Sequence, residues 1–84
     1  VYLKKDYDQS YSGIYYGIIY EHGMGVKTDL KKAIKYYELA NAYSPYEYAT
    51  QRLVYYYSEH PELKNEKKLQ KWKSFADQHG FKID

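Results

Sequence analysis

Residues 16–40 read YGIIYEHGMGVKTDLKKAIKYYELA, and this stretch decides the fold. Its second half places apolar side chains at the i, i+3, i+4 and i+7 spacing of an amphipathic helix, at Leu30, Ala33, Ile34, Tyr37 and Ala40. Asp29 precedes this pattern and is expected to cap the helix. Gly23 and Gly25 end the helix before it, and Gly23 suits the left-handed position after a helix. The stretch therefore predicts two helices joined by a tight loop.

Four helices are expected along the 84 residues, and no strand. The first covers about residues 10–22 and the second begins after Asp29. Ser44-Pro45-Tyr46-Glu47 has the residues of a capping box and predicts the start of the third helix, which His60-Pro61 should end. Asn65 should cap the fourth helix and Gly80 should close it. The third helix is expected to bury Ala49, Leu53, Tyr56 and Tyr57, and the apolar residues of the fourth are Leu69, Trp72, Phe75 and Ala76.

The second half of the chain repeats the first. A shift of 36 residues lays Asp29 on Asn65 and Ala40 on Ala76, and a shift of 37 lays Tyr20 on Tyr57. A period of this size is typical of a helical array, in which each unit buries its apolar face against its neighbours. The predicted fold is an all-α, α/α superhelix (solenoid) of two helix-turn-helix repeats. Its expected parts are a remnant of a preceding repeat with a linker (residues 1–9), repeat one (10–44), a degenerate capping repeat (45–80) and a tail (81–84).

The first repeat resembles the Sel-one-like repeat, a relative of the tetratricopeptide repeat. The resemblance rests on Ser12, Tyr16-Gly17-Ile18-Ile19-Tyr20, Gly23-Met24-Gly25-Val26, Asp29, Lys32-Ala33, Tyr36-Tyr37 and Ala40. It is close over residues 12–44 and degenerate over residues 49–80, where Val54 replaces the counterpart of Gly17. A plain tetratricopeptide array is the alternative, although that motif lacks the Gly-x-Gly-Val loop. The repeat pattern makes Gly17 a point of close helix approach, with Tyr20, Tyr37 and Leu39 filling wider gaps.

Composition argues against several classes of function. Thirteen basic and eleven acidic residues leave a net charge of +2, far from that of a dedicated nucleic-acid binder. No apolar run approaches the roughly 20 residues that a membrane span needs. The chain has no cysteine, and its three histidines (His22, His60 and His79) are scattered, so no metal site, cofactor or catalytic group is expected. The absence of cysteine fits a cytosolic protein and an exported one equally.

The tyrosines left over after the core is filled indicate a binding surface. In tetratricopeptide-like arrays the first helix of each unit lines the concave face, and the resemblance places six residues there: Tyr11, Tyr15, Ile18, Tyr48, Arg52 and Tyr55. Aromatic residues with an arginine are favoured in recognition surfaces. The alternative is that these rings pack on a preceding unit or widen the core.

Three functions follow as hypotheses. The first is a non-catalytic interaction module that binds a peptide or protein on this face. The second is a structural cap of a longer solenoid. The third is a hydrolytic enzyme, because hydrolytic activity is proposed for some cysteine-rich relatives. The lack of cysteine in this chain disfavours that hypothesis. Self-association through the open amino-terminal end is also expected, because two units are fewer than an array normally requires.

Overall fold

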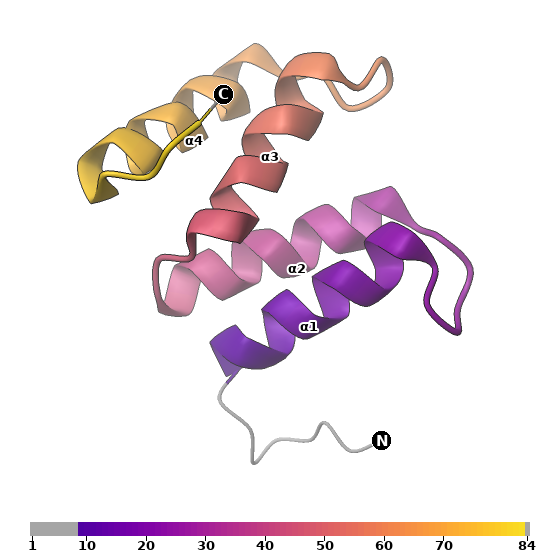
Figure 1. The fold of residues 1–84 in the computed structure, drawn as a ribbon. Coiled ribbons are helices and arrows are strands. Elements are labelled where there is room, and N and C mark those ends of the chain that lie inside the picture. Colours follow the sequence, from indigo (N-terminus) through magenta and orange to yellow (C-terminus); the bar gives the residue numbers. More distant parts are fainter. Residues whose placement is uncertain (1–8, 84) are drawn as a thin grey trace.

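The computed structural model describes residues 9–83, with side chains from Gly13 onward. It contains α1 (Gln9–His22), α2 (Leu30–Tyr43), α3 (Glu47–Glu59) and α4 (Glu66–His79), and these described residues form no strand. Successive helices alternate in direction, so that they form two antiparallel hairpins, α1/α2 and α3/α4 (Figure 1). Helix α2 packs against α3 and joins the hairpins. The prediction of four helices is confirmed, whereas the expected remnant of a preceding repeat lies outside the described residues except for Gln9.

The predicted caps of α2 and α4 are confirmed. The Asp29 side chain accepts a hydrogen bond from the Lys32 backbone N–H at 3.1 Å, and the Asn65 side chain accepts one from Lys68 at 3.0 Å. Each bond satisfies one of the free N–H groups in the first turn of its helix. Gly80 ends α4 in the left-handed conformation, with φ of 71°.

The capping box predicted for the third helix is wrong. Ser44 ends α2 in an extended conformation, and its N–H donates to the Ala40 carbonyl oxygen at 3.1 Å. Helix α3 begins three residues later, at Glu47, after an N-cap residue, Tyr46, whose side chain makes no capping bond. The reason is that Asn41, buried on α2, accepts a hydrogen bond from the Tyr46 N–H at 2.9 Å and so fixes where α3 begins.

The core lies between the two hairpins, with α2 in its middle. Ala33, Tyr37, Ala40, Ala49 and Leu53 are completely buried. The other core residues pack around this centre; they are Ile34, Val54, Tyr56, Tyr57, Leu69 and Trp72. The expectation that Leu39 fills an internal gap is wrong, since its side chain is 40% exposed. Tyr37, two residues before Leu39, and Ala40, directly after it, are completely buried instead.

Helices α1 and α2 approach closely at two glycines. A Cβ added to Gly17 would lie 2.5 Å from the Tyr37 ring, and one added to Gly13 would lie 2.9 Å from the Tyr36 carbonyl oxygen. Both distances are too short for carbon atoms, so only a residue without a side chain allows this packing. Gly17 was predicted from the sequence as a point of close helix approach, and Gly13 was not.

The loops at the ends of the two hairpins make equivalent contacts. The Asp29 N–H donates to the Tyr20 carbonyl at 2.9 Å, and the Asn65 N–H donates to the Tyr57 carbonyl at 3.0 Å. The Lys32 ammonium lies 5.0 Å from the Tyr20 ring centre, and the Lys68 ammonium lies 5.8 Å from that of Tyr57. These pairs are related by the sequence shifts of 36 and 37 residues, so the internal similarity of the sequence extends to local geometry.

Candidate interaction face

The predicted binding residues on α1 and α3 are partly accessible; we call Tyr11, Tyr15, Ile18, Tyr48, Arg52 and Tyr55 the first-helix face. The exposed fraction of the side chain is 50% at Tyr15, 41% at Tyr48 and 49% at Tyr55. Ile18 and Arg52 are half-buried, and the Tyr11 side chain lies outside the described part of the structure. This face therefore presents large aromatic groups to solvent.

The structure brings only some of these residues together. The Arg52 guanidinium lies 5.1 Å from the centre of the Tyr55 ring, and Tyr55 packs edge-on against Tyr56 with ring centres 5.1 Å apart. Tyr48 instead lies edge-on to the buried Tyr37, at 5.9 Å. Tyr15 lies beside its chain neighbour Tyr16, at 6.4 Å. Arg52 and Tyr55 thus form one contact group on α3.

A buried carboxylate behind this face was not predicted from the sequence. Glu21, near the end of α1, is buried and accepts hydrogen bonds from the hydroxyls of Tyr37 and Tyr56, each at 2.6 Å. It also accepts from Arg52 Nε at 2.8 Å and from Arg52 Nη2. Four donor groups from α2 and α3 therefore converge on one carboxylate of α1.

This environment keeps Glu21 ionised. Burial opposes ionisation of the carboxyl group, but the hydrogen bonds from Tyr37, Tyr56 and Arg52, with the charge of Arg52, outweigh burial and hold the pKa of Glu21 below its ordinary value of 4.5. Burial and the hydrogen bond to this carboxylate raise the pKa of Tyr56 to about 12. Both tyrosines consequently act as neutral donors, and the Glu21–Arg52 pair carries no net charge.

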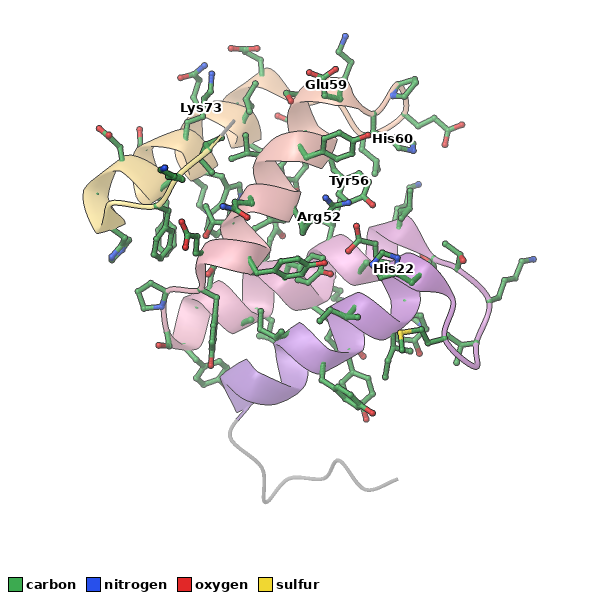
Figure 2. The ribbon with its side chains drawn as sticks, viewed as in Figure 1. His22, Arg52, Tyr56, Glu59, His60 and Lys73 are labelled. Carbon is green, nitrogen blue, oxygen red and sulfur yellow. The ribbon has the colours of Figure 1, made fainter. Side chains whose placement is uncertain are left out.

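Arg52 is therefore not a free cation on the first-helix face. Its charge is balanced by Glu21, and its planar group lies beside the Tyr55 and Tyr56 rings, at 5.1 and 5.2 Å from their centres. Arg52 and Tyr56 lie on the side of α3 that faces the end of α1, where His22 is placed (Figure 2). His22 Nε2 is 3.8 Å from Glu21 Oε1, and the His60 ring centre is 6.0 Å from that of Tyr56.

A pocket of about 340 Å³ continues the face along α3; we call it the tail pocket. It is lined by Gln51, Arg52, Val54, Tyr55, Ser58, Glu59 and Ile83. The chain after α4 returns towards α3 (Figure 1), where Gln51 Nε2 donates to the Lys82 carbonyl at 2.7 Å. The Lys82 N–H in turn donates to the Glu47 carboxylate at 2.9 Å. These two bonds hold Ile83 as one wall of the pocket.

Over the part of the chain that the structure describes, no three histidine, aspartate or glutamate side chains gather as metal ligands would. None of the helices described here has both the length and the apolar character that crossing a bilayer demands. In comparisons with known proteins, no family model, no curated protein and no solved structure matches the chain. The geometry of the first-helix face and the tail pocket is thus the basis for a functional proposal.

Proposed function

We propose that this chain is a non-catalytic protein-interaction module that binds a partner peptide or protein on the first-helix face. The observation that carries the proposal is the exposure of Tyr15, Tyr48 and Tyr55 on helices α1 and α3. Tyrosine supplies a large, rigid contact area at a small cost in side-chain entropy, and its hydroxyl adds hydrogen bonding. Exposed aromatic rings on the first helix of each hairpin are the kind of surface that partner binding buries.

The proposal includes a solenoid-like architecture of two repeats, resembling the Sel-one-like family. The equivalent contacts of Asp29 with Tyr20 and of Asn65 with Tyr57 support it, as do the two matched lysine–tyrosine contacts. In such an array α1 and α3 are the first helices of successive units, so that their exposed faces form one continuous surface. A partner segment lying across both helices would contact Tyr15 and Tyr48 together.

A structural cap is the second candidate, and one observation favours it. The outer side of α4 is polar, with the exposed residues Lys67, Gln70, Lys73, Ser74 and Asp77. Figure 2 shows Lys73 on α4, away from His22 and α1. Terminal units of helical arrays need a polar outer face for solubility. Capping and partner binding use different surfaces, so both roles can belong to one chain.

Site-specific photo-crosslinking tests the binding proposal. A benzophenone amino acid is placed at Tyr15 or at Tyr48, and in a matched control at Lys73 on the outer side of α4. We expect the same protein to be crosslinked in the source cells from both tyrosine positions and not from Lys73. Crosslinks of equal strength from all three positions, or from Lys73 alone, would contradict binding on the first-helix face.

A further inference from the structure

The exposed carboxylate of Glu59 lacks a partner, and it lies at a helix end whose partial negative charge disfavours an acidic side chain. It is the last residue of α3, and within the described part of the chain its carboxylate makes no ion pair and no hydrogen bond. The C-terminal end of a helix carries a partial negative charge from its free carbonyl groups, so an acidic side chain there raises the free energy. By contrast, Glu21 near the end of α1 has the Arg52 guanidinium as its partner.

The tail pocket places this carboxylate beside an aromatic ring and apolar side chains. Tyr55, one helical turn before Glu59, contributes a ring that is half exposed, and Val54 and Ile83 contribute apolar surface. Gln51 and Ser58 add polar groups to the lining. An aromatic ring attracts a cation to its face, and a carboxylate pairs with one directly. The volume of about 340 Å³ is enough for one long side chain.

The arginine of the pocket does not neutralise Glu59. Arg52 and Glu59 are the charged residues of its lining, and the Arg52 charge is already balanced by Glu21, which lies behind the pocket. The Arg52 guanidinium is committed to Glu21 by two hydrogen bonds, which leaves Glu59 as the carboxylate whose charge is not balanced. Glu59 is therefore the charged group of the lining that can pair with a basic ligand.

We propose that the tail pocket binds an arginine side chain of the partner, with its guanidinium between the Tyr55 ring and the Glu59 carboxylate. The aliphatic part of that arginine would cover Val54 and Ile83. Arginine fits better than lysine because its planar group stacks on an aromatic ring while donating to a carboxylate in the same plane. This inference rests on the proposed function, since it specifies one contact that a partner on the first-helix face makes.

Nuclear magnetic resonance titration of the full chain with N-acetyl-arginine amide tests the pocket directly. N-acetyl-citrulline amide is the matched neutral probe, because it has the same shape and no charge. We expect the arginine compound to shift the amide resonances of Val54, Tyr55, Ser58 and Glu59, and the citrulline compound to shift them far less. Equal shifts with both compounds, or shifts confined to residues outside the pocket, would overturn the proposal.

Two substitutions separate the pocket from general electrostatic attraction. Glu59→Gln should raise the Kd for N-acetyl-arginine amide about three- to fivefold, as expected for one exposed ion pair. Glu62→Gln removes the same charge from an exposed residue outside the pocket and should leave the Kd unchanged. Equal effects of the two substitutions would overturn the proposal. Because Glu59 is exposed, loss of folding is not expected to obscure the result, and circular dichroism checks it.

The outcomes for the pocket and for the proposed function can be told apart. If N-acetyl-arginine amide fails to bind while Tyr15 and Tyr48 still crosslink a partner, the pocket proposal is wrong and the interaction face stands. If the arginine probe titrates the pocket while the crosslinks from Tyr15, Tyr48 and Lys73 are the same, the interaction face is wrong and the pocket stands.

Discussion

Arg52 on α3 donates two hydrogen bonds to the Glu21 carboxylate on α1, across 31 positions of the sequence. The hydroxyls of Tyr37 and Tyr56 complete the set of donors, so one carboxylate connects α1, α2 and α3. An ion pair with additional hydrogen bonds fixes the relative position of the helices that carry it, because each donor must meet the carboxylate at a defined place. The two hairpins are joined at this point, directly behind the first-helix face.

Replacing Glu21 should destabilise the protein strongly. Glu21→Gln keeps the shape of the side chain but leaves the half-buried Arg52 guanidinium without a counter-charge. Removing one partner of a buried pair costs about 3–5 kcal/mol, and the partial exposure of Arg52 reduces this to about 2 kcal/mol. Urea denaturation measures the difference, with Glu62→Gln as an exposed control that should change stability by less than about 0.5 kcal/mol. Equal effects of the two substitutions would show that the Glu21 cluster contributes little.

The stability that Glu21 provides should disappear in acid. Its pKa is below 4.5 in the folded protein, because the hydrogen bonds and the Arg52 charge outweigh the effect of burial. The unfolded chain therefore binds this proton first as the pH falls, and the stabilisation present above about pH 4.5 is lost as the pH passes down through the folded pKa. The difference in unfolding free energy between the wild type and Glu21→Gln should thus shrink in acid. A difference that is the same at about pH 3 and about pH 7 would contradict this assignment.

The Tyr56 hydroxyl should ionise only at high pH, and its ionisation should lower the stability of the folded protein. Burial and the hydrogen bond to Glu21 raise the pKa of Tyr56 from 10.0 to about 12. A group with a raised folded pKa stabilises the protein fully below its unfolded pKa, and that contribution is lost as the pH rises from about 10 to about 12. In an absorbance titration of tyrosine ionisation, the difference between the wild type and Tyr56→Phe should have a midpoint near 12. A midpoint near 10 would mean that Tyr56 is not bound to the carboxylate.

Gly17→Ala should destabilise the first hairpin although alanine favours helices. The new methyl group would lie 2.5 Å from the completely buried Tyr37 ring, which its bond to Glu21 prevents from moving away. Overpacking of this kind costs about 1–3 kcal/mol and outweighs the roughly 1 kcal/mol gained in helix propensity. In a Tyr37→Leu background the same substitution should cost less, as thermal unfolding of the four proteins in a double-mutant cycle can show. Additive effects would contradict a contact at this position.

Asn41, and not Ser44, should determine the start of α3. Asn41 accepts a hydrogen bond from the Tyr46 N–H and donates one to the Thr50 hydroxyl at 3.0 Å. Asn41→Ala removes the acceptor of the half-buried Tyr46 N–H and the donor to the buried Thr50 hydroxyl, and should cost about 2 kcal/mol, whereas Ser44→Ala should cost less than about 0.5 kcal/mol. Chemical denaturation of the two variants measures this order. A larger loss of stability from Ser44→Ala than from Asn41→Ala would support the capping box predicted from the sequence.

The features predictable from the sequence are those set by neighbouring residues. Asp29 and Asn65 cap their helices by accepting from an N–H three residues ahead, and Gly80 ends α4 by a local change of backbone direction, so short patterns reveal them. Asn41 was missed because it acts on the following helix. Ser44 was misread because a serine before a proline also suits the end of a helix, as in α2.

The candidate site was predictable only in outline. Exposed tyrosines on two helices follow from counting the residues that the core does not need. The Glu21–Arg52 pair could not be read from spacing, since its partners are 31 residues apart and each has many alternatives in a chain with 29% charged residues. One signal existed: Glu21 lies beside apolar Ile18 and Tyr20 near the end of a helix, where an acidic residue needs a counter-charge. The tail pocket depends on the return of Ile83 to α3, which no sequence pattern indicated.

The most direct test of the binding proposal is the Kd of the crosslinked partner, measured by calorimetry with the wild type, Tyr15→Ala and Tyr48→Ala. We expect each substitution to weaken binding at least about tenfold, as truncation of a buried aromatic contact does. We expect little change in the melting temperature of Tyr15→Ala, because its side chain is half exposed. An unchanged Kd together with a lowered melting temperature in both variants would contradict partner binding on this face and favour the structural cap.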